Sequence, residues 1–176
     1  MVQLSKLFGS KVRLKVLEYF LRNPTKRIHA AELIRKVKVS KKSLFDSLPY
    51  LEEKGYLVSE RIGRSIRYSL IRENMIVKQL KMLLNILTIE QVVQKIKQDA
   101  QMVFLFGSAA RGENVEESDL DVLIISDVSR GKILKKIKSQ IPNVKPLVFT
   151  PLEYARLSRT DKPFYKRIEQ DKIRLL

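Results

Sequence analysis

Two acidic residues, Asp119 and Asp121, stand at the start of an apolar run and are separated by a single leucine. In a strand, side chains two positions apart point the same way and lie roughly 6.5–7 Å apart. The two carboxylates would then converge while Leu120 turns into the core. Hard divalent cations prefer a few carboxylates together with substrate phosphates, so the pair predicts a site for Mg²⁺ or Mn²⁺.

A Gly-Ser turn comes shortly before this acid pair. Val103–Phe106 reads as an apolar strand, which ends at the turn Gly107-Ser108, and a short helix starts at Ala109–Arg111. Glycine lets the backbone approach a ligand closely, and the N–H groups of a helix N-terminus receive phosphate. We therefore expect Gly107 and Ser108 to bind phosphate, with Arg111 as a secondary phosphate contact if the ligand is a nucleotide. A phosphate-binding turn that faces a pair of metal-binding carboxylates is an arrangement suited to phosphoryl or nucleotidyl transfer.

The two motifs together, G-S-x-A-R-G at residues 107–112 and S-D-x-D at residues 118–121, resemble the signature of minimal nucleotidyltransferases. These enzymes belong to the DNA polymerase β superfamily. The resemblance implies a nucleoside triphosphate as substrate or ligand, with Asp119 and Asp121 as catalytic metal ligands. The alternative is an acidic surface hairpin after a buried strand, in which Gly107 serves only the turn.

The chain departs from this family's pattern on a later strand. The family usually places a third carboxylate near the position where this chain has Asn143, Lys145 and Pro146, and the next acid here is Glu153. Two-metal catalysis would lose a ligand without it, whereas nucleotide binding is still expected. Three acids in the loop before the pair could substitute: Glu113, Glu116 and Glu117.

Composition limits the remaining possibilities. A chain of 176 residues, 44% of them hydrophobic, fits one medium domain or two small ones. The absence of cysteine excludes disulfides and thiolate metal sites and fits a reducing compartment. No apolar run reaches the ~20 residues of a membrane span, and the first residues, MVQLSKLFGSKVRLK, lack the features of a signal peptide. We expect a cytoplasmic protein.

The net charge of +16 is unevenly distributed along the chain. Residues 1–73 hold 17 Lys and Arg against 7 Asp and Glu, a net charge of +10, and residues 74–176 hold 18 against 12, a net charge of +6. Such an excess predicts a polyanionic partner, most often nucleic acid. The alternative is a lysine-rich solvated surface.

The N-terminal third of the chain predicts three helices. Ser10 can cap a first helix that ends before Pro24, and a second helix covers Ala30–Val37. Ser40 can cap a third, in which Leu44, Leu48 and Leu51 form a buried stripe. Pro49 interrupts this third helix and costs roughly 3 kcal/mol in a helix interior, so the helix either bends there or is shorter.

Two β-rich runs, Tyr56–Ile62 and Ser65–Ile71, surround Gly63-Arg64 and predict a hairpin. Helices followed by such a hairpin resemble the winged helix-turn-helix domain of archaeal and bacterial transcription regulators, over about residues 9–72. A recognition helix presents its first residues to the DNA major groove, and a basic hairpin contacts phosphate. The expected DNA contacts are Lys41, Lys42, Ser43, Ser47, Arg61, Arg64 and Arg67. The alternative is a protein–protein or dimerisation module.

The single histidine, His29, is expected to be a capping or surface residue at the start of the second helix. The segment after the hairpin predicts two amphipathic helices that are broken near Thr88. The first could link the domains and also form the seam of a homodimer. We therefore expect a winged domain at 1–73, a linking helix at 74–87 and a nucleotidyltransferase-like domain at 88–176.

The remainder of the chain alternates between helix and strand. The expected fold class is α+β, with an N-terminal winged helix-turn-helix and a C-terminal nucleotidyltransferase-like α/β domain that contains a small mixed sheet. After residue 126 the expected elements are a basic helix Gly131–Gln140, a strand Val144–Phe149, helices Pro151–Arg156 and Phe164–Gln170, and a strand Ile173–Leu176.

Two functions follow from these patterns. In the first, a DNA-binding protein, expected to be a transcriptional regulator, carries a domain that binds Mg–NTP and transfers a nucleoside monophosphate to an acceptor. In the second, the C-terminal half is a catalytically inactive module that acts as a nucleotide sensor or as a protein-partner domain. Double-stranded DNA and a nucleoside triphosphate are expected partners in both.

Overall fold

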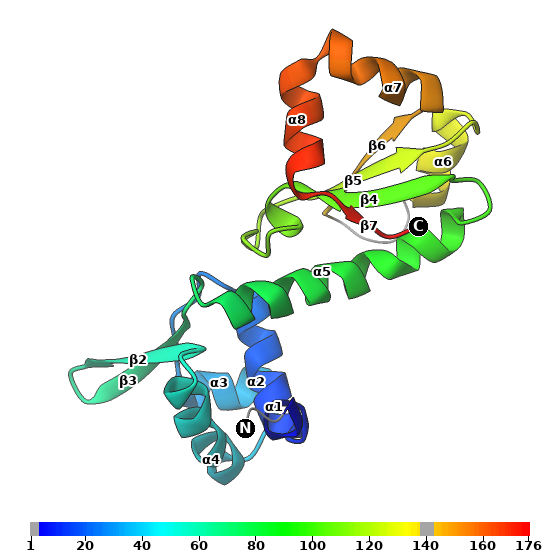
Figure 1. The fold of residues 1–176 in the computed structure, drawn as a ribbon. Helices are drawn as coiled ribbons and strands as arrows, with labels where there is room; N and C mark the ends of the chain where they lie inside the picture. Colours follow the sequence, from blue (N-terminus) through cyan, green and yellow to red (C-terminus); the bar gives the residue numbers. More distant parts are fainter. Residues whose placement is uncertain (1–3, 138–142) are drawn as a thin grey trace. The chain divides into compact units, whose positions relative to one another are not determined.

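The computed structural model describes residues 4–137 and 143–176. The chain forms two compact units, Met1–Lys78 and Gln79–Leu176 (Figure 1). Each unit contains its own β-sheet and its own helices, so the predicted α+β fold class is confirmed. None of the described helices is both long enough and apolar enough to cross a membrane.

The first unit is built around three helices. They are α2 (Lys11–Arg22), α3 (Ala30–Val37) and α4 (Lys41–Glu53), preceded by the short helix α1 (Leu4–Phe8), which the sequence analysis did not include. Contacts between α2 and both other helices enclose an apolar core. Its fully buried side chains include Phe20, Leu33, Leu44, Leu48 and Leu51.

A three-stranded antiparallel sheet completes this unit. It contains β1 (Ile28–His29), β2 (Leu57–Ile62) and β3 (Ser65–Leu70) in the order β1-β3-β2. Gly63 has a φ of 60° in the two-residue turn between β2 and β3, which suits glycine because a side chain is strained there. The sequence of helix, strand, two helices and hairpin is that of a winged helix-turn-helix. We call the β2–β3 hairpin the wing.

Local chemistry explains most boundaries in this unit. The hydroxyl of Ser40 accepts a hydrogen bond from the backbone N–H of Ser43 at 3.1 Å, as expected of a helix cap. Helix α4 nevertheless continues through Pro49 to Glu53. Pro49 cannot donate to the carbonyl one turn earlier, but Leu48 and Leu51 are buried on either side of it. Their burial offsets the lost hydrogen bond, so the shorter-helix alternative is wrong.

One helix, α5 (Met75–Ile96), replaces the two that the sequence analysis expected. The predicted break near Thr88 is wrong, because the helix continues past it and buries Ile89, Val92 and Ile96. The hydroxyl of Thr88 donates to the carbonyl of Leu84 at 2.8 Å, which satisfies it inside the helix although such back-bonding slightly weakens a helix. The expected boundary between residues 87 and 88 consequently falls inside a continuous helix.

The second unit contains a four-stranded mixed sheet. Its strands are β4 (Met102–Phe106), β5 (Leu120–Ile125), β6 (Val144–Phe149) and β7 (Ile173–Arg174), in the order β6-β5-β4-β7. β5 and β6 are parallel, and β4 is antiparallel to both β5 and β7. The predicted small mixed sheet is therefore confirmed.

Helices cover both faces of this sheet (Figure 1). The C-terminal half of α5 and helix α6 (Arg130–Ile137) pack on one face, against Val103, Val122 and Ile124 among others. Helices α7 (Pro151–Thr160) and α8 (Lys162–Asp171) pack on the opposite face. Helix α7 is longer than predicted, and the end expected for the basic helix at Gln140 lies outside the described residues.

Candidate functional site

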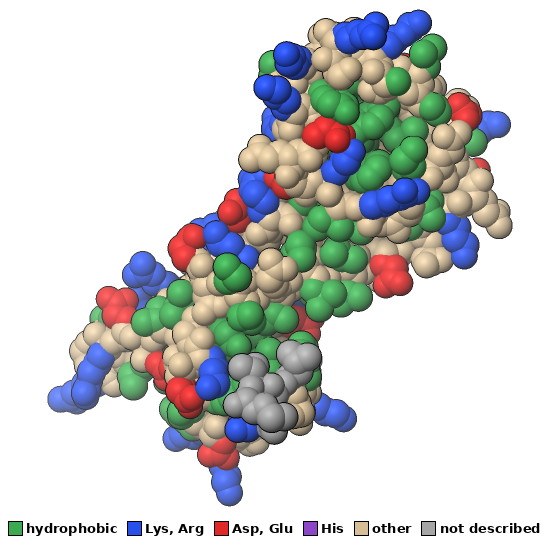
Figure 2. Space-filling model, in the orientation of Figure 1, with side chains coloured by type: hydrophobic (Ala, Val, Ile, Leu, Met, Phe, Trp, Pro, Cys, Tyr) green, Lys and Arg blue, Asp and Glu red, His purple; other side chains and the backbone are tan. Residues whose placement is uncertain are grey.

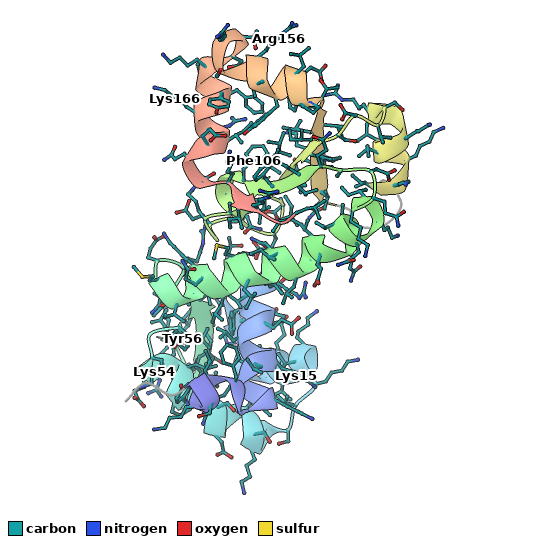
Figure 3. The ribbon with its side chains drawn as sticks, turned by 45° about the vertical axis from the view of Figure 1, so that its right-hand side comes forward. Lys15, Lys54, Tyr56, Phe106, Arg156 and Lys166 are labelled. Carbon is teal, nitrogen blue, oxygen red and sulfur yellow. The ribbon has the colours of Figure 1, made fainter. Side chains whose placement is uncertain are left out.

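A row of three side chains crosses the sheet of the second unit at the start of β5. Asp121 is paired in register with Phe106 on β4 and with Lys145 on β6. Side chains of directly paired residues project from the same face of a sheet. Phe106 belongs to the apolar cluster that α7 and α8 cover, so Asp121 and Lys145 project from that face as well. Figure 3 labels Phe106, which lies on the side of the sheet facing α8.

The two acids of the S-D-x-D motif lie close enough to influence each other. Asp121 is half-buried on β5, and Asp119 is exposed immediately before the strand begins. Burial raises the pKa of the Asp121 carboxyl above its ordinary value, whereas the positive charges of Lys145 and Arg167 act to lower it. The negative charge of Asp119 adds to the rise. The acid pair therefore shares its surroundings with two cations.

Gly107 lies directly against the Asp121 carboxylate. It follows β4 and opens a short 3₁₀ helix (Gly107–Ala109) with a φ of 72°. A Cβ atom at this position would lie 3.1 Å from Oδ2 of Asp121, so both the backbone conformation and the space favour glycine. The structure thus brings together the glycine of the first motif and the second aspartate of the other.

Asp171, at the end of α8, occupies the same corner of the unit. Its Oδ1 accepts a hydrogen bond from the backbone N–H of Gly107 at 3.1 Å, and its Oδ2 accepts one from Arg111. Arg111 also donates to Glu113 at 2.8 Å, and its bonds to Glu113 and Asp171 raise the pKa of Arg111 above its ordinary value. A phosphate contact by the backbone N–H of Gly107 would require this N–H to leave Asp171, whereas Arg111 has further guanidinium N–H donors beside the two that bond Glu113 and Asp171.

Sequence reasoning did not find Asp171. It lies 64 residues from Gly107 and belongs to no motif. The only available signal was its place immediately before the terminal strand, because a strand that pairs with β4 brings the preceding residues to the Gly-Ser turn. Ser108, the other predicted phosphate-binding residue, is half-buried, and its carbonyl accepts a bond from the N–H of Glu113 at 2.8 Å.

The side chains around Asp121 do not form a resident metal centre. Among residues 4–137 and 143–176, no group of three or more His, Cys, Asp or Glu side chains gathers that could hold a metal ion. None of the three loop acids proposed as substitutes completes a site, and Glu113 is held by Arg111. Lys145 is the register partner of Asp121 on β6, at the strand position where a third carboxylate was expected. The acid pair could share a metal ion that a bound triphosphate brings with it, but the side chains around it do not make a metal site by themselves.

A buried polar network supports the loop that follows the Gly-Ser turn. Asn85 on α5 is 5% exposed, and its amide nitrogen donates to the Ala109 carbonyl and to the Asn114 side chain, both at 2.9 Å. Buried amides of this kind are costly to leave unpaired. The network fixes the loop that leads from the Gly-Ser turn to the two aspartates.

The first unit presents the second group of predicted residues. Lys41 and Lys42 are exposed at the start of α4, and Ser43 shares a hydrogen bond between hydroxyls with Ser40 at 2.8 Å. Ser47 is different, because it is 5% exposed and its hydroxyl donates to the carbonyl of Ser43 at 2.8 Å. Its position three residues after buried Leu44 places it on the inner side of the helix. Ser47 is therefore not presented to a ligand.

The wing carries the remaining basic residues. Arg61 and Arg64 are exposed on it, and Figure 2 shows Lys and Arg side chains at its tip. Arg67 instead donates from Nε to Nε2 of His29 at 2.9 Å, while Nδ1 of His29 lies 3.2 Å from the carbonyl of Ile66. His29 stands at the N-cap position of α3, as one of its two predicted roles requires, but its side chain makes no cap hydrogen bond there. It ties β1 to β3 instead.

Comparison with solved structures gives only distant similarities. HlyU from Vibrio cholerae N16961 is 23% identical, with 48% of this chain and 86% of that chain covered and a TM-score of 0.39. A structure described as the predicted DNA-binding transcriptional regulator from E. coli is 25% identical, with coverages of 46% and 81% and a TM-score of 0.38. TrmBL2, an archaeal chromatin protein, is 14% identical, with coverages of 94% and 76% and a TM-score of 0.33. The winged-helix assignment rests instead on the strand pairing and helix order described above.

No curated protein is significantly similar to this chain. Residues 86–176, slightly more than half of the chain, match the family described as "Nucleotidyltransferase domain". The match covers the mixed sheet, the Gly-Ser turn, both aspartates and Asp171. The family typically uses Mg²⁺ and a nucleoside triphosphate. The chain therefore belongs to the nucleotidyltransferase domain family.

Proposed function

We propose that this protein is a DNA-binding regulator whose nucleotidyltransferase domain binds a nucleoside triphosphate. The proposal that the domain binds a nucleotide rests on the contact between the Gly-Ser turn and the acid pair. A Cβ atom added to Gly107 would lie only 3.1 Å from the Asp121 carboxylate. Two motifs separated along the chain converge on one corner of the sheet. Such convergence supports a ligand site better than it supports an acidic hairpin.

The ligand is expected to arrive as Mg–NTP. Two carboxylates can share a divalent ion with triphosphate oxygens, because Mg²⁺ is commonly held by one or two carboxylates plus phosphates. Asp119 and Asp121 would contact that ion, and the backbone of Gly107 and Ser108 would approach the phosphates. The ion, when bound, neutralises phosphate charge, while the protein's own residues position the nucleotide.

The DNA-binding half rests on the first unit. Lys41, Lys42 and Ser43 lie at the exposed start of α4, which is the helix that enters the major groove in winged helix-turn-helix proteins. Arg61 and Arg64 on the wing supply phosphate contacts. Ser47 is left out of this set because it is buried, and Arg67 contributes less because its Nε is bonded to His29.

Nucleotidyl transfer is the second candidate function, favoured by the intact pair Asp119 and Asp121. An acceptor hydroxyl or phosphate oxygen would attack the α-phosphorus, the bond between the α-phosphorus and the bridging oxygen would break, and pyrophosphate would leave. The acceptor's proton would pass to solvent. The pairing of Lys145 with Asp121 favours a binding module over this reaction.

One experiment separates the two candidates. The protein is incubated with Mg²⁺ and α-³²P-labelled NTPs, with and without double-stranded DNA and lysate proteins, beside the double variant Asp119→Ala/Asp121→Ala. Label transfer that disappears in the variant supports the enzyme. NTP binding without transfer, together with salt-sensitive DNA binding, supports the regulator. If nucleotide changes DNA affinity, DNA must change nucleotide affinity by the same factor. A protein that binds no NTP under any condition would overturn both candidates.

A further inference from the structure

We infer that neutral His29 keeps Arg67 from binding DNA, and that protonation of His29 frees Arg67 to contact DNA phosphate. The inference rests on the proposed DNA binding by the first unit, because it concerns when one basic residue of the wing is available. It depends only on contacts within that unit. It gives the single histidine of the chain a regulatory role.

His29, Arg67 and Glu60 form a row across the sheet of the first unit. His29 on β1 and Glu60 on β2 are both register partners of Arg67 on β3. Side chains of directly paired residues project from the same face of a sheet. The adjacent residues Ile28 and Tyr68 are buried in the core, so alternation along the strands turns the row toward solvent. An anion can therefore approach it.

The hydrogen bonds of His29 require a neutral ring. Nε of Arg67 lies 2.9 Å from Nε2 of His29, and because a guanidinium can only donate, Nε2 must be an unprotonated acceptor. Nδ1 lies 3.2 Å from the carbonyl oxygen of Ile66, so it carries the ring proton and donates it to that oxygen. Both ring nitrogens are thus engaged in one neutral tautomer.

Protonation of His29 removes the acceptor that holds Arg67. The added proton occupies Nε2, so a donor and a positive charge would face the guanidinium where the hydrogen bond had been. Among the residues that the structure describes, Arg67 forms no ion pair with a carboxylate. Histidine is the side chain whose charge ordinarily changes between pH 5 and pH 8. Acidification through this range therefore releases Arg67.

The other charged groups around the row act in both directions. Arg27, two residues before His29, pairs with Glu60 at 3.5 Å, and both side chains are exposed. Arg27 and the N-terminal end of the α3 dipole oppose a positive charge on His29, whereas Glu60 and Glu32 in the first turn of α3 favour it. A DNA phosphate beside the row would add a further negative charge and favour the protonated ring.

Protonation and DNA binding are therefore coupled. In the protonated state the imidazolium and the freed Arg67 can both pair with phosphate, and in the neutral state neither does. Each phosphate contact contributes about 0.9 to the slope of log K against log salt. Since coupling is reciprocal, DNA that prefers the protonated form must also drive proton uptake by the protein.

The test measures binding of a fluorescent DNA duplex to the full chain by anisotropy over a series of salt concentrations. The series is run at about pH 8 and again at about pH 5, the limits between which histidine ordinarily changes charge. The variants are His29→Gln, whose amide oxygen can accept from Arg67 at either pH, and Arg67→Gln. The matched control is Arg61→Gln, which removes an exposed wing arginine. Circular dichroism at each pH verifies the fold.

We expect the slope of the unmodified protein to steepen by about 1 to 2 on acidification, one contact from Arg67 and up to one from the imidazolium. In His29→Gln the slope should be equal at the two pH values. Arg67→Gln should retain a change of at most about 1, and Arg61→Gln should lower the slope by about 0.9 at both pH values without removing the change. Calorimetry in buffers of different ionisation enthalpy should show proton uptake on DNA binding that His29→Gln lacks.

Two results would overturn this inference while leaving the proposed function intact. One is a slope that does not change with pH in the unmodified protein. The other is a change on acidification that His29→Gln retains in full. Absence of salt-sensitive DNA binding at both pH values would instead contradict the proposed DNA binding itself.

Discussion

The carboxylate of Asp171 accepts a hydrogen bond from the backbone N–H of Gly107 at 3.1 Å, across 64 residues of sequence. The same carboxylate holds Arg111, and its side chain is only 11% exposed. One acid at the end of α8 therefore accepts hydrogen bonds from both the glycine and the arginine of the G-S-x-A-R-G motif. The turn is held in place by the C-terminal end of the domain.

We expect Asp171→Ala to lower the free energy of unfolding by about 1.5–3 kcal/mol, the range for hydrogen bonds to charged groups. Asp171→Asn should cost less, because its amide oxygen can still accept from Gly107 while the charge toward Arg111 is lost. Urea unfolding followed by circular dichroism measures both variants. Equal stability of Asp171→Ala and the unmodified protein would show that the bond contributes nothing.

Gly107→Ala should destabilise the domain and weaken triphosphate binding. A left-handed backbone conformation costs a non-glycine residue about 1–2 kcal/mol, and the added Cβ would lie 3.1 Å from the Asp121 carboxylate and displace it. Gly63→Ala is the matched control, since its φ of 60° gives a similar strain with no atom within 4 Å of the new Cβ. Only Gly107→Ala should alter nucleotide affinity, measured by calorimetry. A similar loss of affinity in Gly63→Ala would rule out the proposed contact with Asp121.

Asp121→Asn should make the protein more stable at neutral pH. Burial raises the pKa of Asp121, opposed by Lys145 and Arg167, so the folded state carries the charged carboxylate at a cost that the unfolded state does not. That cost is present above the raised pKa and disappears as pH falls to the ordinary value of about 3.9. The stability difference between the variant and the unmodified protein should therefore shrink on acidification through this window. Urea unfolding at several pH values checks it, and a difference that grows at low pH would contradict the assignment.

The basic residues of the winged unit should control the salt dependence of DNA binding. Each lost phosphate contact lowers the slope of log K against log salt by about 0.9. Lys41→Ala/Lys42→Ala and Arg61→Ala/Arg64→Ala should therefore each reduce the slope by up to about 2, as measured by fluorescence anisotropy.

The double variant Lys132→Ala/Lys135→Ala on α6 removes the same charge and serves as the control for those measurements. Its slope should stay unchanged, because both lysines belong to the second unit. If all three double variants lose the same amount, binding depends on overall charge and the winged unit has no special role. Arg67→Ala should affect stability more than slope, because its Nε is bonded to His29.

Local patterns predicted much of this protein. The helix cap at Ser40, the strand Val144–Phe149 and the hairpin around Gly63 follow from rules that act over a few residues, and the structure contains all three. The Gly-Ser turn and the S-D-x-D motif were found for the same reason. Each is a short pattern whose chemistry depends on spacing alone.

Long-range partners were beyond such rules. The contact of Asp171 with Gly107 depends on how β7 pairs with β4, and no spacing in the chain encodes it. The position of Ser47 illustrates a second limit, because a hydroxyl near the start of a helix reads as a surface group. Its burial follows from which side of α4 packs against the core, and the leucine stripe that starts at Leu44 already contained that information.

The short strand β7 has a consequence for solubility. β4, with the sequence MVFLF, is the most apolar strand of the sheet. Ile173 and Arg174 pair with its outer side, and the backbone of Leu175 and Leu176 hydrogen-bonds to Val103. An uncovered strand of this kind offers unpaired N–H and C=O groups to other chains and invites aggregation. β7 and the residues after it therefore cover the outer edge of β4. A variant that ends at Lys172 should aggregate by pairing of the exposed β4 strands of different molecules, even though its helices remain folded.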